Sequence, residues 1–239
     1  MIIGVNYAND YSDGIRGTDD DRVGPFRLTG SGAARPATVK RAAIISLALG
    51  GLFGVVLVAV AQMRWALVVG AAAIAAAWFY TGGRKPYGYL GLGELFVFVF
   101  FGLVAVNGTA LAITGRPSWA ALLGSVAIGL LAVALMLTNN LRDIPTDAVS
   151  GKRTLAVRLG ERGTRLLYTT TLLAPFVLMV PVIIAHWPAA LVLLALPLAI
   201  GPVRKVLGGA MGRDLIPVLG ATGRLELVFS LLLLVGLVL

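Results

Sequence analysis

The sequence contains no cysteine and a single histidine, and only 13% of its 239 residues are charged. Without cysteine the chain has no disulfide, no thiol nucleophile and no thiolate ligand for a metal. A soluble domain carries charge on about a quarter of its residues, so the low charge content argues against that class. Acidic residues are the scarcer of the two charged kinds, 11 against 20 basic ones, and their positions are therefore informative.

Apolar residues make up 58% of the chain and occur in long, uninterrupted runs. A helix needs about 20 apolar residues to cross the hydrocarbon core of a bilayer. The runs that meet or approach this length are 42–61, 65–83, 95–114, 119–138, 166–185, 189–203 and 225–239, and residues 1–8 form a partial one. We therefore expect an all-α fold, a polytopic transmembrane helix bundle that forms a single domain over residues 1–239 in the lipid bilayer.

The distribution of charge predicts how the bundle lies in the membrane. If every run crosses, the connections 9–41, 84–94, 139–165 and 204–226 lie on one side, and all acidic residues fall there. All basic residues except Arg64 and Arg116 fall on the same side. Lys and Arg are enriched in cytoplasmic loops, so we place this side in the cytoplasm. The net charge of +9 is then a topology signal and does not indicate nucleic-acid binding.

The first acidic cluster follows the partial run at the start of the chain. Asn6, Asp10 and Asp13 are spaced i, i+4, i+7, which places them on one face of a helix, and Asn9 directly precedes Asp10. Gly14 is expected to end this helix, because glycine readily adopts the backbone conformation of a helix C-terminus.

The second acidic cluster directly follows the apolar run 119–138. Asn140, Asp143 and Asp147 are spaced i, i+3, i+7, again one helix face. Pro145 lies within this spacing, so we expect the helix to kink or stop near Asp143 and Asp147 to lie on a loop.

Carboxylates beside lipid are costly and indicate function. Magnesium binds hard oxygen ligands, takes one or two carboxylates per ion and completes its shell with water and phosphates. Two acidic clusters facing each other would hold a diphosphate through Mg²⁺, and nearby cations would bind the remaining phosphate charge. The candidate catalytic residues and metal ligands are Asp10, Asp13, Asp143 and Asp147, and the candidate substrate-binding residues are Asn6, Asn9, Arg16, Arg22, Lys85, Tyr87, Asn140, Lys152 and Arg153.

A third polar segment, residues 80–94, lies on the same predicted side between two apolar runs. Its glycines and proline exclude a long helix, so we expect a shaped loop that caps the site and contributes a cation.

These motifs resemble the UbiA superfamily of intramembrane prenyltransferases. That family carries an Asn-Asp-x-x-Asp motif and an Asp-x-x-x-Asp motif, which read here NDYSD at residues 9–13 and DIPTD at residues 143–147. Residues 4–32, 82–94 and 139–160 are most similar to one branch, the 1,4-dihydroxy-2-naphthoate polyprenyltransferases. Many superfamily members have a further Asp at the position of Gly17, whereas here the next carboxylate is Asp19.

The resemblance implies a Mg²⁺-dependent enzyme of the cell membrane. Such an enzyme binds the diphosphate of a long polyprenyl donor and favours its ionisation to an allylic cation. The ring of 1,4-dihydroxy-2-naphthoate attacks that cation with loss of CO₂, which gives demethylmenaquinone. The resemblance also implies a UbiA-type bundle of which this chain supplies seven full spans and a partial N-terminal helix, the first of nine helices being missing.

Three alternatives remain open. Another aromatic acceptor, such as 4-hydroxybenzoate or homogentisate, would use the same donor chemistry. The order Asp10-x-x-Asp13-Gly14 resembles the opening of the CDP-alcohol phosphotransferase motif, but the Ala-Arg pair that should follow is absent from the sequence. A membrane cation transporter would hold its charges near the bilayer midplane, whereas the carboxylates here are predicted to lie at one face.

Overall fold

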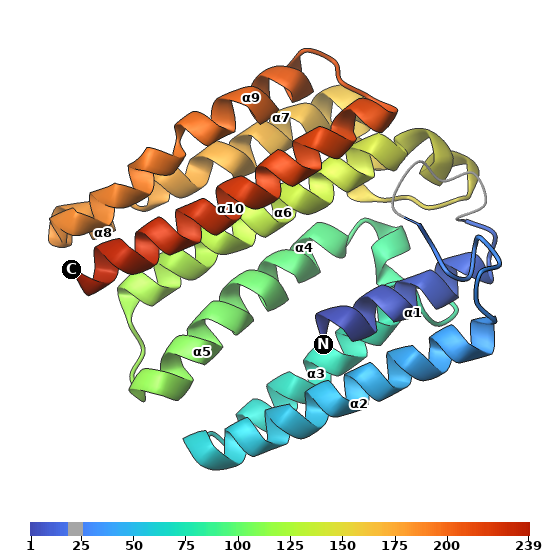
Figure 1. The fold of residues 1–239 in the computed structure, drawn as a ribbon, viewed down its shortest axis with the longest axis horizontal. Helices are drawn as coiled ribbons and strands as arrows, with labels where there is room; N and C mark the ends of the chain where they lie inside the picture. Colours follow the sequence, from blue (N-terminus) through green and yellow to red (C-terminus); the bar gives the residue numbers. More distant parts are fainter. Residues whose placement is uncertain (19–25) are drawn as a thin grey trace. The chain divides into compact units, whose positions relative to one another are not determined.

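The computed structural model describes residues 1–18 and 26–239, and this part of the chain is entirely helices and their connections (Figure 1). The helices form two compact units. The N-terminal unit comprises Met1–Gly93 and Pro145–Thr154, and the C-terminal unit comprises Glu94–Ile144 and Leu155–Leu239. The predicted all-α class is confirmed, while the single domain stays a prediction.

Three helices and a short 3₁₀ helix make up most of the N-terminal unit: α1 (Ile2–Gly14), α2 (Pro36–Ala61), α3 (Ala66–Phe79) and η1 (Tyr87–Leu90). Proline at the first position of α2 has no N–H to leave unsatisfied and has the helical φ angle already set. Helix α1 packs against both α2 and α3, which fixes the polar C-terminal end of α1 within this unit.

The C-terminal unit is built from longer apolar helices around one hydrophobic core. Its elements are α4 (Gly93–Val97), the π-helical turn η2 (Phe98–Val104), α5 (Ala105–Thr114), α6 (Trp119–Val149), α7 (Leu155–Leu178), α8 (Val180–Ala185), η3 (Trp187–Ala195), α9 (Pro197–Leu207), η4 (Gly212–Asp214) and α10 (Leu215–Val238). Leu131, Tyr168 and Phe229 are fully buried in that core. The backbones of η2 and α6 approach closely at Gly102 and Gly129, where a Cβ on Gly102 would lie 2.5 Å from the Gly129 Cα.

The helices have the length and composition of a multi-pass membrane protein. Within the described residues, five helices can cross a bilayer, or six if the bent pair Trp187–Ala195 and Pro197–Leu207 counts as one span. Ala66–Phe79 is equally apolar but shorter. The apolar window of Gly93–Thr114 is only 6% buried inside the protein, which suits contact with lipid. The predicted apolar runs lie mainly in helices, except that the run 65–83 continues past the end of α3 at Phe79. The count of seven full spans stays a prediction.

Two helix boundaries differ from the predictions. Helix α6 continues through Pro145 to Val149, so the prediction that it stops near Asp143 is wrong and Asp147 is helical. Pro145 faces outward and removes one backbone hydrogen bond only a turn before the helix ends, a small loss so close to the terminus. Helix α10 begins at Leu215 rather than at residue 225, because Gly220, Gly223 and Arg224 interrupt the apolar run without breaking the helix.

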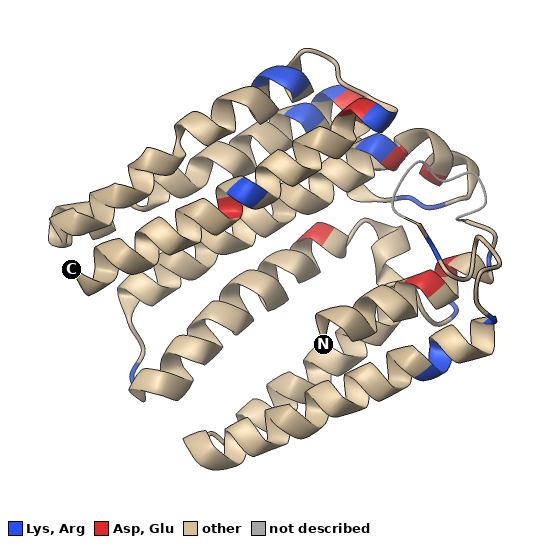
Figure 2. Ribbon diagram, in the orientation of Figure 1, with Lys and Arg blue, Asp and Glu red and all other residues tan. Residues whose placement is uncertain are grey.

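Charged residues of the C-terminal unit gather where α6 ends, where α7 begins and where α9 ends (Figure 2). Arg116, in the turn between α5 and α6, lies at the other end of α6. Arg224 and Glu226 lie within α10 and depart from this pattern. The segregation of charge that the sequence predicts is thus largely present along these helices.

Candidate functional site

Asp10 holds a backbone segment against the C-terminal half of α1. Its carboxylate is 6% exposed, and its two oxygens accept hydrogen bonds from the N–H groups of Leu28 and Thr29, each at 2.8 Å. Bonds from N–H groups to an ionised acceptor are about twice as strong as neutral ones. Gly14 permits this approach, because a Cβ there would lie 2.5 Å from the Thr29 Cβ.

Asp13 lies one turn further along α1 and is 5% exposed. Its Oδ1 accepts a hydrogen bond from the Tyr89 hydroxyl at 2.6 Å, and its Oδ2 pairs with Lys152 Nζ at 3.2 Å. The three side chains come from α1, from the 80–94 loop and from the segment after α6, all within the N-terminal unit. The three polar segments that the sequence singles out thus meet at one carboxylate.

Two cations lie over the ring of Tyr89. Lys152 Nζ is 4.9 Å from the ring centroid, and the guanidinium carbon of Arg16 is 5.6 Å from it. A cation over an aromatic face is attracted to the negative face of the ring. Arg16 also donates hydrogen bonds to the backbone carbonyls of Thr81 and Gly83, which ties the 80–94 loop to the end of α1.

The hydroxyl of Tyr89 stays protonated at neutral pH. Burial raises the pKa of Tyr89 above its ordinary value of 10, and the charge and hydrogen bond of Asp13 raise it further, while Thr18 and Arg16 lower it. Tyr89 is therefore a permanent hydrogen-bond donor to the Asp13 carboxylate.

Tyr87, the tyrosine predicted to bind substrate, does not donate its hydroxyl to Asp13 as Tyr89 does but to a different partner. Its hydroxyl donates to the backbone carbonyl of Ala76 in α3 at 2.8 Å, and burial raises its pKa to about 12. The loop turns at Gly88, whose N–H donates to the Tyr80 carbonyl at 3.0 Å. Tyr87 therefore ties the loop to α3, and Tyr89 reaches Asp13. The only signal in the sequence was the pair of tyrosines that flanks Gly88.

The two predicted asparagines of α1 differ in their contacts. Asn9 Oδ1 accepts a hydrogen bond from Thr81 Oγ1 at 2.9 Å, which adds to the contacts between α1 and the 80–94 loop. Asn6 is exposed, and its amide donates to the Ile2 carbonyl of its own helix at 3.1 Å.

The remaining predicted cations of the N-terminal unit lie at its surface or outside the described residues. Lys85 is exposed in the 80–94 loop. Arg153 is exposed, and its backbone N–H donates to the Tyr89 carbonyl at 2.9 Å. Arg22 lies outside the described residues, so its predicted contact with phosphate stays a prediction.

The second acidic cluster is divided between the two units. Asp143 belongs to the C-terminal unit, where Nε and a terminal nitrogen of the buried Arg142 donate to its two oxygens at 2.7 and 2.8 Å. Asp147 belongs to the N-terminal unit and is 9% exposed, and its backbone carbonyl accepts a hydrogen bond from the Lys152 N–H at 2.9 Å. A meeting of the two clusters stays a prediction.

Asp10 and Asp13 have the chemistry that a magnesium ion requires. A carboxylate offers about four lone-pair positions, and the hydrogen bonds described above occupy two on each residue. Within residues 1–18 and 26–239 no three Asp, Glu or His side chains group closely enough to form a metal cage. Magnesium needs no such cage, because one or two carboxylates, water and substrate phosphates complete its shell.

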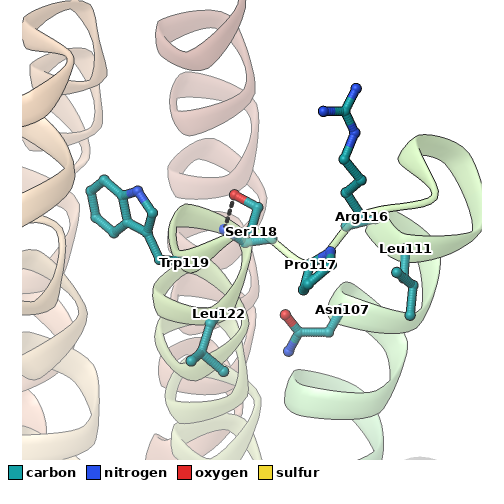
Figure 3. Close-up of a pocket in the computed structure, with 9 residues that line it drawn as sticks. Asn107, Leu111, Arg116, Pro117, Ser118, Trp119 and Leu122 are labelled. Atoms are coloured by element: carbon teal, nitrogen blue, oxygen red, sulfur yellow. Dashed lines mark hydrogen bonds between the residues drawn. The ribbon is translucent and has the colours of Figure 1, made fainter.

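A cavity of about 330 Å³ lies at the turn between α5 and α6 (Figure 3). Asn107, Leu111, Arg116 and Trp119 are among the residues that line it. At 1.5 Å per residue, Trp119 is about 30 Å along α6 from Asn140, so this cavity is separate from the second acidic cluster.

Comparison with known proteins gives consistent matches. The model of the UbiA prenyltransferase family matches residues 1–210. The chain is 54% identical over 231 residues to a 1,4-dihydroxy-2-naphthoate octaprenyltransferase of Mycobacterium tuberculosis, which covers 97% of this chain and 79% of that protein. A protein of the same name from Escherichia coli is 43% identical over 178 residues, which cover 72% of this chain and 58% of that protein. Another from Haemophilus influenzae is 36% identical over 241 residues, which cover 97% of this chain and 78% of that protein.

Proposed function

The chain belongs to the UbiA prenyltransferase family, and we propose that it transfers a polyprenyl group from polyprenyl diphosphate to 1,4-dihydroxy-2-naphthoate. The reaction releases diphosphate and CO₂ and gives demethylmenaquinone, a step of menaquinone biosynthesis. The observation that carries the proposal is the 54% identity, over 97% of this chain, to a naphthoate octaprenyltransferase.

The N-terminal unit supplies one half of the diphosphate site in this proposal. Asp10 and Asp13 are the metal ligands, and Mg²⁺, when bound, stabilises the negative charge that develops on the leaving diphosphate. Tyr89 orients the Asp13 carboxylate through its hydroxyl. Lys152 Nζ is 3.2 Å from Asp13 Oδ2. In this proposal Lys152 and Arg16 offset the carboxylate charge and bind phosphate oxygens.

The second acidic cluster supplies the other half. Asp143 and Asp147 carry the second set of metal ligands, and Asn140 binds substrate beside them. Asn6, Asn9, Lys85 and Arg153 are proposed to contact the substrate, and Arg22, which lies outside the described residues, stays a candidate phosphate ligand. Tyr87 acts only through the loop, because its hydroxyl bonds to the Ala76 carbonyl. We propose a bundle of seven spans and the partial helix α1, with the diphosphate site on its cytoplasmic face by the charge rule. Apolar helix faces shield the allylic cation from water, and the prenyl tail lies in lipid.

The proposal is tested with membranes that contain the protein, radiolabelled polyprenyl diphosphate and a panel of aromatic acids. We expect a lipid-soluble labelled product with 1,4-dihydroxy-2-naphthoate, formed only when Mg²⁺ is supplied. Membranes from cells without the protein provide the blank. Transfer to 4-hydroxybenzoate or homogentisate in place of the naphthoate would contradict the proposed acceptor.

Replacing the two loop tyrosines by phenylalanine should have different effects. Tyr89→Phe keeps the ring beneath the two cations but removes a hydrogen bond to a charged acceptor, worth about 1.5–3 kcal/mol. We expect kcat/KM to fall about 10–100-fold. The Mg²⁺ concentration that gives half-maximal activity should rise. Tyr87→Phe loses the bond to the Ala76 carbonyl and should lower stability by about 1 kcal/mol with turnover preserved. Equal losses of turnover in the two variants would contradict this assignment.

A further inference from the structure

Glu94 is a buried carboxylate that has no role in the diphosphate site proposed above. It lies in the first turn of α4, is 5% exposed, and accepts a hydrogen bond at Oε1 from the Asn140 amide at 2.8 Å. Its second oxygen, Oε2, is buried and has no hydrogen-bond partner among the residues that the structure describes. Both residues belong to the C-terminal unit.

A buried carboxylate oxygen without a partner is costly. The oxygen has lost its water and gained no donor in exchange, which costs on the order of 1–3 kcal/mol or more for a charged group. About 90% or more of buried polar groups in proteins are hydrogen-bonded, and an exception needs an explanation such as a catalytic role, a bound water or an ion. The orphaned Oε2 therefore indicates a donor that binds there from outside the chain.

The contact with Asn140 fixes the level of Glu94 along α6. Asn140 precedes Asp143 by three residues, about 4.5 Å along the helix axis, and it directly follows the apolar run 119–138. Glu94 thus contacts α6 on the apolar side of Asp143. A ligand at Oε2 would therefore lie at the level where the apolar run of α6 meets its polar end.

The chemistry of the oxygen narrows the class of ligand. A diphosphate is excluded, because two anions repel each other in a site that water does not enter. A metal ion is disfavoured, because Asn140 turns its NH₂ group, a hydrogen-bond donor, toward this carboxylate and not an oxygen that could bind a metal. The remaining class is a hydroxyl donor on an apolar body, which describes a hydroxylated aromatic ring.

We propose that Glu94 is a catalytic residue that accepts the proton of a ring hydroxyl of the aromatic acceptor, an inference that rests on the function proposed above. The O–H bond of the 1-hydroxyl, which is ortho to the carbon that carries the carboxylate, breaks and its proton moves to Oε2. The electron pair passes through the ring to the carbon that carries the carboxylate. That carbon bonds to the prenyl carbon as the bond from prenyl carbon to diphosphate oxygen breaks. CO₂ then leaves, its bonding pair restores the aromatic ring, and Glu94 returns the proton to the oxygen.

The test compares wild type with Glu94→Gln on the dihydroxy acceptor and on its 1-O-methyl and 4-O-methyl ethers. With the dihydroxy acceptor we expect Glu94→Gln to lower kcat/KM about 100-fold, the usual scale of general-base catalysis, while KM for the prenyl diphosphate is unchanged. On the 1-O-methyl ether, which has no proton for Glu94 to accept, wild type and variant should agree within about threefold. On the 4-O-methyl ether the 100-fold difference should persist.

Acceptor binding gives a second measurement that does not need turnover. Glu94→Leu removes the acceptor oxygen altogether, and it should raise the Kd of the dihydroxy compound and of the 4-O-methyl ether while leaving the Kd of the 1-O-methyl ether unchanged. Equal effects on both ethers, or no effect of either substitution, would overturn the proposal. If wild type uses a different hydroxylated acceptor, the proposed function fails. The same comparison with that acceptor and its methyl ether still tests Glu94.

Discussion

Asp10→Asn is expected to lower prenyl transfer about a thousandfold or more, the scale of losing a principal electrostatic group in an active site. The substitution keeps the shape of the side chain but removes the negative charge that a metal ion requires. Transfer is measured as the rate of labelled product formation in membranes, across a range of Mg²⁺ concentrations. Magnesium should not restore the rate at any concentration.

The same substitution should also loosen the segment at residues 28–30. The carboxylate accepts two backbone N–H groups, whereas an asparagine side chain has one acceptor oxygen and turns its NH₂ group toward the other N–H. Losing one hydrogen bond to a charged acceptor costs about 1.5–3 kcal/mol. We expect faster proteolysis near Thr29 and a lower Tm in detergent.

Asp214→Asn is the matched control for this experiment, because Asp214 is an exposed acidic residue of the C-terminal unit, in η4. It removes the same charge and should leave both transfer and Tm unchanged. Normal turnover in Asp10→Asn would refute the metal assignment. A loss of turnover without any change in proteolysis would show that the bonds to residues 28–30 contribute little.

The membrane-spanning part of the fold was predictable because long apolar runs in this sequence have few uses other than crossing lipid. The ends of the helices were not predictable in the same way. Helix α6 continues past Pro145 to Val149, because backbone hydrogen bonding extends into polar residues that a hydropathy pattern assigns to a loop. Helix α10 starts at Leu215, because its glycines and Arg224 interrupt the apolar run but not the helix. Helix ends are decided by capping and packing, which hydropathy does not report.

The candidate site was predictable only where its residues share one helix. The spacing of Asp10 and Asp13 correctly placed both on one face of α1. Asp13 contacts Tyr89, which is 76 residues away in the sequence, and Lys152, which is 139 residues away. The contact with Tyr89 also depends on the turn at Gly88. The contact of Glu94 with Asn140 is of the same kind. Pairs like these are set by tertiary packing, so spacing along the chain cannot reveal them.

Asp143→Asn is the second substitution from which we expect a loss of about a thousandfold in prenyl transfer. In the C-terminal unit Asp143 is held by two hydrogen bonds from Arg142, a fork that fixes the plane of the carboxylate. Asparagine retains one of these bonds. We therefore expect the side chain to keep part of its orientation while the metal-binding charge is lost. A Tm close to that of wild type would show that the loss of activity comes from the charge and not from a loss of stability.

The decisive question is whether Asp10 and Asp143 act on one diphosphate, and a double-mutant cycle answers it. The asparagine pair would be too slow to measure, so the cycle uses Asp10→Glu and Asp143→Glu, which keep the charge and displace it by one methylene. We expect each to lower kcat/KM about 30-fold. The effects of substituting residues that act as a unit are strongly non-additive. A shared site therefore predicts that kcat/KM of the double variant is about 30–100-fold below that of wild type. Independent sites would multiply the two losses to about a thousandfold, and that outcome would contradict a diphosphate held jointly by the two acidic clusters.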